Sequence, residues 1–132
     1  MRTSLTLAAM IASAATLAAP AAASQEQVVR CTIGNGAAHY RGSCMLLVTD
    51  ERGSFEIAPA KRARFFGRMH AIRVTILPPG DARVHAYSRE AEEPPRPLDL
   101  GGPVSVADWG VALRSPRGRS CWVGSGFSVC AY

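Results

Sequence analysis

The chain has 132 residues, and its 15 Lys and Arg residues outnumber its 10 Asp and Glu residues, for a net charge of +5. Residues 24–132 amount to one domain of ordinary size, and their pattern shows no internal repeat or second domain. The positive charge favours an anionic ligand or surface and argues against a strongly cationic partner.

The N-terminus has the features of a secretory signal peptide. Arg2 precedes an Ala-rich apolar run over residues 5–19, and small residues at 19–23 provide two Ala-x-Ala cleavage signals. The run is shorter than the ~20 residues that cross a bilayer. We therefore expect residues 1–23 to be removed by cleavage near 21–24, leaving an exported protein with no transmembrane span.

Four cysteines in the remaining chain predict two disulfides. An even number is typical of an exported disulfide framework, and the spacing lacks the C-x-x-C pairs of a zinc site. A two-residue turn at 125–126 pairs Cys121 with Cys130 at a Cα separation of about 4.5 Å, which a disulfide accepts. Cys31 then bridges to Cys44. Loop entropy favours the nested pairs Cys31–Cys130 and Cys44–Cys121 by about 1–2 kcal/mol. We nevertheless prefer the local pairs, because hairpin register brings their cysteines together and no bridge forms unless the strand geometry permits it.

The chain before the C-terminal hairpin consists mostly of strand patterns. Runs of β-branched or alternating apolar residues are separated by turn signals such as Gly34-Asn35-Gly36. These runs cover residues 28–33, 45–49, 54–57, 72–77, 82–88 and 106–114. Because period-two alternation recurs at short intervals, we expect an antiparallel sheet with one face in water.

Alternation also predicts which side chains face inward. The predicted inward residues of the fourth and fifth runs are Ile72, Val74, Ile76, Ala82, Val84 and Ala86. A turn centred on residues 78–81 pairs Ile76 with Arg83 and Val74 with His85. In the sixth run, Trp109, Val111 and Leu113 share one face. Trp109, together with Trp122 and Phe127, is expected to pack in the core.

Two segments break the strand pattern. Residues 58–69 fit either a helical turn or a loop, and the proline-rich residues 89–103 fit a long surface loop. The predicted fold is therefore all-β, a small antiparallel sandwich or barrel of hairpins with two disulfides and room for one short helix.

The sequence predicts no catalytic residue, metal site or cofactor. His39, His70 and His85 lack the spacing of metal ligands, and Ser125 lacks the G-x-S-x-G pattern of a nucleophile elbow. An enzyme would need residues that converge from separate strands, His39 or His85 among them. We treat a small hydrolase as the less favoured alternative.

Basic residues form two clusters that are candidates for binding. The first contains Lys61, Arg62, Arg64, Arg68 and Arg73 around two phenylalanines, and the second contains Arg114, Arg117 and Arg119. Such patches bind phosphates, nucleic acid or anionic surfaces. Export argues against nucleic acid, so we expect an anionic envelope polymer, a lipid head group or an acidic protein. The competing interpretation is a solvated face that aids solubility.

Three blocks of sequence resemble a known group of proteins. They are Cys31, Asn35-Gly36, Tyr40, Gly42 and Cys44; then Gly53-Ser54-Phe55-Glu56-Ile57; then Cys121-Trp122 and Val129-Cys130-Ala131. This pattern is similar to that of small bacterial proteins that carry signal peptides. The resemblance implies one cohesive periplasmic or secreted domain and supplies no catalytic residues.

The leading functional prediction is a non-enzymatic exported binding or structural domain. The contact surface is expected at Lys61–Arg73, extended by Arg114–Arg119. The first alternative is an inhibitor of an envelope-degrading enzyme, similar to a lysozyme inhibitor, by analogy of fold class alone.

Overall fold

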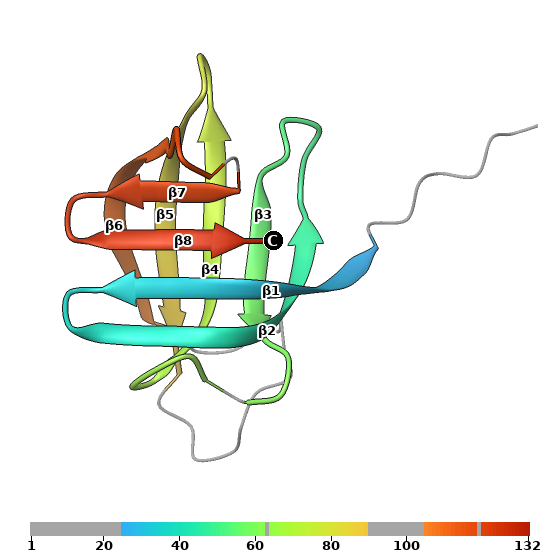
Figure 1. The fold of residues 1–132 in the computed structure, drawn as a ribbon, viewed down its shortest axis with the longest axis vertical. Coiled ribbons are helices and arrows are strands. Elements are labelled where there is room, and N and C mark those ends of the chain that lie inside the picture. Colours follow the sequence, from blue (N-terminus) through green and yellow to red (C-terminus); the bar gives the residue numbers. More distant parts are fainter. Residues whose placement is uncertain (1–24, 63, 90–104, 119) are drawn as a thin grey trace, which may run out of the picture.

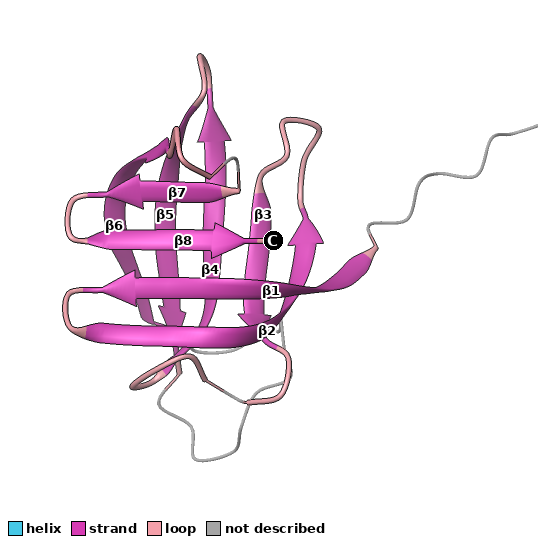
Figure 2. Ribbon diagram, in the orientation of Figure 1, coloured by secondary structure: helices cyan, strands magenta, loops and turns pink. Residues whose placement is uncertain are grey.

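The structure is a computed structural model that describes residues 25–62, 64–89, 105–118 and 120–132. This part of the chain contains strands and loops but no helix (Figure 2). The strands are β1 (Glu26–Asn35), β2 (Ala38–Val48), β3 (Phe55–Pro59), β4 (Met69–Leu77), β5 (Asp81–Ser88), β6 (Ser105–Arg114), β7 (Cys121–Gly124) and β8 (Phe127–Ala131). The predicted signal peptide lies outside the described residues. So do Arg119 and the part of the proline-rich segment that follows Arg89.

The strands form a closed antiparallel barrel. Each strand pairs with the next one along the chain, and β8 pairs with β1 to close the sheet. The predicted all-β fold is therefore confirmed, in its barrel form. Since no described residue is helical, the described chain offers no helix that could cross a membrane.

Two groups of strands cross each other in Figure 1. β7, β8, β1 and the first part of β2 run across the view, whereas β3 to β6 run nearly vertically behind them. The long strand β2 joins the groups, because residues 38–47 pair with β1 and residues 44–48 pair with β3. The core lies between the two groups.

The predicted inward faces of β4 and β5 are confirmed. Ile72, Val74 and Val84 are fully buried, and Ile76 packs partly buried against the same core. The largest buried apolar side chains contributed by the other strands include Ile33, Ile57, Trp122, Phe127 and Val129. Alternation of apolar and polar residues thus decides which side of each strand lines the barrel.

Residues 60–62 and 64–68 form a loop in place of the helical alternative. The Phe65 N–H donates to the Met69 carbonyl at 2.8 Å, and the Met69 N–H donates to the Phe66 carbonyl at 3.1 Å. Gly67 lies inside this turn with φ 57°. A left-handed residue of this kind fits a tight turn and interrupts a right-handed helix.

Both predicted local disulfides are confirmed. Cys121 lies opposite Cys130 with a Cα separation of 4.0 Å, in the predicted hairpin register. Cys31 bridges to Cys44 with a Cα separation of 5.9 Å, and both of these side chains are buried inside the barrel. The first bridge therefore braces the outer surface and the second braces the core.

The geometry of the β1–β2 hairpin explains the spacing of its sequence block. Cys31 lies opposite Gly42, and it reaches diagonally to Cys44. The Tyr40 side chain folds across the space that Gly42 leaves, since a Cβ at Gly42 would lie 2.9 Å from the Tyr40 hydroxyl oxygen. The Tyr40 ring also packs edge-on against Phe65, with 4.9 Å between centroids. The tyrosine, glycine and cysteines thus form one packed inner surface.

The β4–β5 register differs from the prediction by one residue. The predicted pairs Ile76–Arg83 and Val74–His85 are wrong, and the observed pairs are Ile76–Ala82 and Arg73–His85. The predicted four-residue loop would make the inward Ile76 the cross-strand partner of the outward Arg83. The observed three-residue loop, 78–80, instead brings Ile76 and Ala82 to the same inward face.

The predicted face of β6 is also wrong. Asp108 and Gly110 pair with consecutive residues of β5, so Trp109 is an extra residue in a β-bulge. Trp109 is half-buried and packs 5.5 Å from Phe127, whereas Val111 and Leu113 are exposed. A bulge of one residue reverses the alternation that follows it.

We expect Gly124→Ala to lower the free energy of unfolding by about 1–3 kcal/mol, because the added methyl group overpacks the core. A Cβ at Gly124 would lie 2.1 Å from Cζ of Phe127 and 2.8 Å from the Val111 carbonyl oxygen. Urea unfolding of the oxidised protein measures the loss. Gly118→Ala is the control, since its Cβ would meet the Cys121 sulfur at an ordinary 3.4 Å. Equal midpoints for the two variants would contradict this packing.

Candidate functional site

The two predicted basic clusters lie at opposite ends of the barrel. Lys61 and Arg62 are exposed in the β3–β4 loop, at the bottom of Figure 1, and Arg117 is exposed in the β6–β7 loop, near the top. Successive antiparallel strands alternate in direction, so these two connections leave from opposite ends. The structure does not bring the clusters together into one surface, and their binding role stays a prediction.

Other residues of the first cluster vary in their exposure. Arg64 is half-buried and Arg68 is exposed. The Arg68 carbonyl accepts a hydrogen bond from the Arg89 N–H at 3.3 Å, which ties the loop to the end of β5. This loop is therefore anchored next to the sheet.

Arg73, a predicted binding residue, holds a buried carboxylate. Its Nε donates to Oε1 of Glu56 at 2.7 Å, and its Nη2 contacts the same oxygen. The Glu56 side chain is 8% exposed and the Arg73 side chain 40% exposed. The guanidinium also lies 5.4 Å from the centre of the Tyr87 ring. Because a buried carboxylate needs a charged partner, Arg73 has a structural task.

Arg114, another predicted binding residue, covers a core ring. Its guanidinium lies 4.9 Å from the centre of the Trp122 ring, and Trp122 is buried. Arg114 and Trp122 are also direct partners across β6 and β7. This cation–π contact makes Arg114 a cover for the end of the barrel.

A second ion pair links β5 and β6 on the same outer surface as Arg73. Nη2 of Arg83 donates to Oδ2 of Asp108 at 2.7 Å, and the Gly110 N–H donates to Oδ1 at 2.9 Å. These hydrogen bonds, from Arg83 above all, hold the pKa of the Asp108 carboxyl below its ordinary value. His85 Nε2 lies 4.0 Å from Asp108 Oδ1. The carboxylate is thus charged and satisfied at neutral pH.

The outer surface of β3 to β6 is therefore balanced in charge, and we call it the paired wall. Its ion-paired residues are Glu56, Arg73, Arg83 and Asp108, with His85 beside Asp108, and the other charged residues of these strands are Asp81 and Arg114. His85 and Asp108 are in contact, as a hydrolase would require, but they lie on the convex outside of the barrel. The described residues contain no group of three His, Cys, Asp or Glu side chains placed to hold a metal ion.

The remaining histidines do not join this contact. His39 is exposed on β2, and His70 is buried on β4. His39 contributes to an open depression of about 290 Å³ over the β1–β2 and β7–β8 turns, which is lined mainly by glycines. That depression has no charged side chain other than the titratable imidazole.

The outer surface of β7, β8, β1 and β2 has a different charge pattern, and we call it the arginine wall. Its outward strand residues include Cys121, Val123, Ser128, Cys130, Arg30, Thr32, Gly34, His39, Arg41 and Ser43. Arg30 and Arg41 make no ion pair or side-chain hydrogen bond with any described residue. Glu26, at the start of β1, is the sole carboxylate side chain of these four strands.

Strand register brings the two arginines to one place. Thr32 lies opposite Arg41 on β2 and opposite Cys130 on β8. Arg30 is two residues from Thr32 on the same face, and its carbonyl accepts a hydrogen bond from the Tyr132 N–H at 2.8 Å. Pairing of β1 with both neighbours therefore assembles the group.

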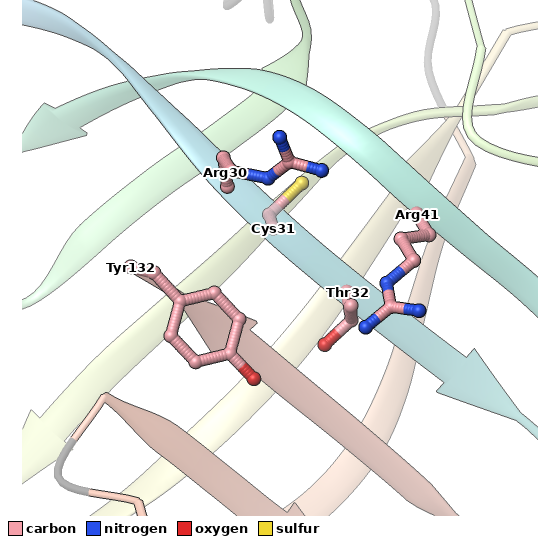
Figure 3. A pocket seen from close by; sticks show the side chains of 5 residues that line it. All are labelled: Arg30, Cys31, Thr32, Arg41 and Tyr132. Atoms are coloured by element: carbon pink, nitrogen blue, oxygen red, sulfur yellow. The ribbon is translucent and has the colours of Figure 1, made fainter.

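A depression of about 270 Å³ lies among these side chains. It is lined by Arg30, Cys31, Thr32, Arg41 and Tyr132. Figure 3 shows the Arg41 guanidinium and the Thr32 and Tyr132 hydroxyls directed toward a common space, while the Arg30 guanidinium lies over β1 beside Cys31 and points away from the two hydroxyls. Every polar side-chain group of this set except the hydroxyls is a cationic donor, so the depression suits an anion.

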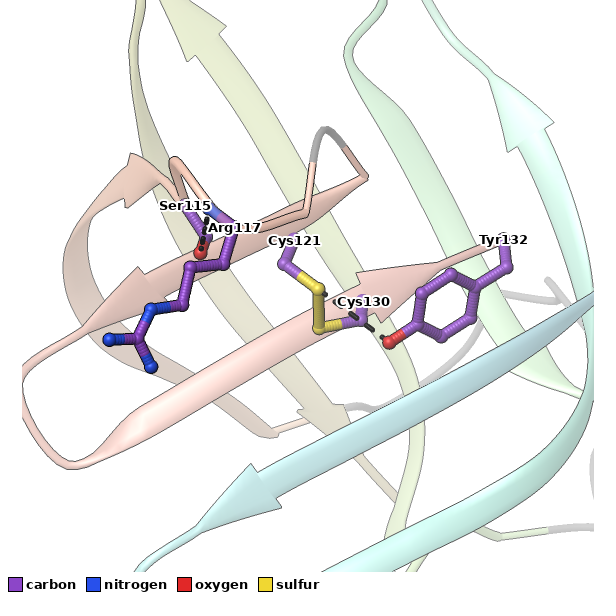
Figure 4. Close-up of a disulfide and its surroundings, with 5 residues drawn as sticks. All are labelled: Ser115, Arg117, Cys121, Cys130 and Tyr132. Carbon is purple, nitrogen blue, oxygen red and sulfur yellow. Dashed lines mark hydrogen bonds between the residues drawn. A yellow bond between two sulfur atoms is a disulfide. The ribbon is translucent and has the colours of Figure 1, made fainter.

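Tyr132 lies beside the Cys121–Cys130 disulfide. The Tyr132 hydroxyl lies 3.8 Å from the Cys121 sulfur, beside the Cys121–Cys130 bridge. Figure 4 shows the tyrosine on one side of this bridge and Arg117 on the other. Arg117 is oriented locally, since its N–H donates to the Ser115 hydroxyl at 3.3 Å. The bridge thus lies between Tyr132 of the depression and Arg117 of the predicted second cluster.

Sequence reasoning missed Arg30, Thr32, Arg41 and Tyr132 as a site. A two-residue turn after Asn35 would have placed Thr32 opposite Arg41, which was a usable local signal. The position of Tyr132 depends on the β1–β8 pairing, and no local pattern encodes that contact.

No family model matches the chain, and neither a curated protein nor a solved structure matches it.

We expect Arg73→Gln to destabilise the protein by about 1–3 kcal/mol, because it leaves the Glu56 carboxylate buried without its guanidinium. The loss is smaller than for a fully buried pair, since Arg73 is 40% exposed. Thermal and urea unfolding measure it, with the exposed Arg62→Gln as the neutral control. The double variant E56Q/R73Q should recover part of the loss. Equal stability of R73Q and R62Q would show that Arg73 has no structural task.

Proposed function

We propose that the protein is a non-enzymatic exported binding domain that contacts anionic envelope material or an acidic partner through arginine side chains. The observation that carries this proposal is the contrast between the two walls. On the paired wall Arg73 and Arg83 each have a carboxylate within hydrogen-bond distance, whereas Arg30 and Arg41 have none among the described residues.

The contrast has a direct consequence for binding. An arginine that already shares its donors with a carboxylate gains little from an external anion, because the two anions compete for the same N–H groups. Unpaired guanidinium groups retain their charge and their donors, so they attract and hold an anion. Ligand binding is therefore expected on the arginine wall, with Lys61 and Arg62 as a separate contact at the end of the barrel.

Export is part of the same proposal. Two disulfides, each closing a local loop, are compatible with an oxidising compartment outside the cytoplasm. The apolar N-terminal segment supplies the expected route to that compartment. A periplasmic or secreted domain would meet anionic polymers and lipid head groups of the envelope directly.

Retention on an immobilised polyanion tests the binding function. We expect the oxidised protein to be retained on dextran sulfate but not on neutral dextran, and to elute as salt screens the contact. R30E/R41E should elute at markedly lower salt than K61E/R62E. Both double variants change the net charge equally, so a difference between them locates the contact rather than reporting net charge.

The outcomes separate the function from its location. Equal elution of the wild type and both double variants would contradict binding through a specific arginine surface. A larger loss in K61E/R62E would keep the binding function and move its contact to the β3–β4 loop, as the sequence predicts. Circular dichroism of each variant checks that the barrel is intact.

A further inference from the structure

We propose that the depression on the arginine wall is a binding site for a phosphomonoester group. The inference rests on the proposed binding function and specifies its ligand chemistry. The site consists of Arg30, Thr32, Arg41 and Tyr132, which line one depression of about 270 Å³. None of the four residues belongs to the basic clusters that the sequence predicts.

The backbone fixes the positions from which the four side chains extend. Thr32 and Arg41 are direct partners across β1 and β2, and Arg30 precedes Thr32 by one repeat of the strand. The Tyr132 N–H donates to the Arg30 carbonyl, which places the tyrosine beside β1. The neighbouring Cys121–Cys130 bridge holds β8 to β7. Three of the four residues thus lie on paired strands, which place a site more precisely than loops do, and rotation of the Arg30 side chain would bring its guanidinium to the ligand.

The donors of the site match the oxygens of a phosphomonoester. Two guanidinium forks supply charged N–H groups, and the Thr32 and Tyr132 hydroxyls supply further donors. A phosphomonoester has three free oxygens that point in different directions and a charge of about −1.5 to −2 at neutral pH. A planar carboxylate has two coplanar oxygens and a single charge, so one fork satisfies it. Two forks and two hydroxyls therefore favour the tetrahedral dianion.

No described side chain near the depression neutralises its two arginines. No carboxylate side chain lines the depression. Glu26 lies on the same strand as Arg30, four residues away, which is about 13 Å along an extended strand. That distance exceeds a Debye length at physiological salt, about 8 Å. An incoming phosphate therefore meets two charges that no described side chain compensates.

The size of the depression also limits the ligand. Its volume of about 270 Å³ is below the ~300–1,000 Å³ of pockets that enclose drug-sized molecules. A phosphate group with the first atoms of its ester fits such a space, while the remainder of the molecule would stay outside. Two sources of this chemistry are a soluble phosphomonoester and a lipid with a terminal phosphate.

Nuclear magnetic resonance titration of the oxidised protein tests the site. Methyl phosphate is the probe, and dimethyl phosphate is the matched control with the same tetrahedral centre but one charge. We expect methyl phosphate to shift the amide signals of Thr32 and Arg41 and to bind about tenfold or more tightly than dimethyl phosphate or acetate. Equal affinity for the three anions would overturn the proposal.

Variants assign the binding to the named side chains. R30Q and R41Q should each weaken methyl phosphate binding by about tenfold, and R41K should weaken it less than R41Q but not restore the wild-type affinity, because lysine keeps the charge without the fork. T32V, which preserves the shape of the side chain, should cost a few-fold. R52Q removes an exposed arginine from the β2–β3 loop and should bind as the wild type. Wild-type affinity in R30Q/R41Q would overturn the proposal.

Vesicles distinguish the two sources of the phosphate. Binding to neutral vesicles that contain phosphatidate, and loss of that binding in R30Q/R41Q, would assign the site to a lipid phosphomonoester. Binding of methyl phosphate without preference for phosphatidate over phosphatidylglycerol would assign it to a soluble ligand. Both results support the phosphate site. Retention on dextran sulfate that is lost in K61E/R62E and kept in R30Q/R41Q, with no response to methyl phosphate, would overturn this site and leave the binding function intact.

Discussion

The pairing of β8 with β1 is the contact on which the rest of the structure depends. Its two ends are marked by hydrogen bonds from the Gly36 N–H to the Gly126 carbonyl, at 2.9 Å, and from the Tyr132 N–H to the Arg30 carbonyl, at 2.8 Å. An open sheet would have two unpaired edges and would leave its inner apolar face in water. Closure buries that face and joins the first strand of the domain to the last. The disulfides reinforce the hairpins on either side of this seam.

Closure also creates the functional asymmetry of the molecule. The paired wall uses its arginines to satisfy Glu56 and Asp108, so its charges stabilise the fold. The arginine wall contains the seam itself, and its two arginines have no such task among the described residues. Exposed guanidinium groups that lack a carboxylate partner keep their charge and their donors available to an anionic ligand. The proposed binding function and the proposed phosphate site both rest on these two arginines, and the second specifies the ligand of the first.

Sequence patterns predicted the features that depend on neighbours along the chain. The Cys121–Cys130 register followed from one turn, and the buried faces of β4 and β5 followed from alternation. Alternation could not reveal the bulge at Trp109, because the residues after it are apolar on both faces, with Ala112 buried and Val111 and Leu113 exposed. The approach of Tyr132 to Arg30 was equally inaccessible, since it joins opposite ends of the domain. Clustering of basic residues in sequence pointed instead to two loops that barrel topology separates.

Amide hydrogen exchange along the β1–β8 seam is the most direct test of this account. If the barrel is closed, the amides of Thr32, Gly34 and Gly36 are protected to the same degree as those of the buried β4–β5 pair, because all of them open only when the barrel unfolds. Rapid exchange at these three amides, with β4 and β5 still protected, would show an open sheet. In that case Tyr132 would not be held beside Arg30, and the arginine wall would not exist as described.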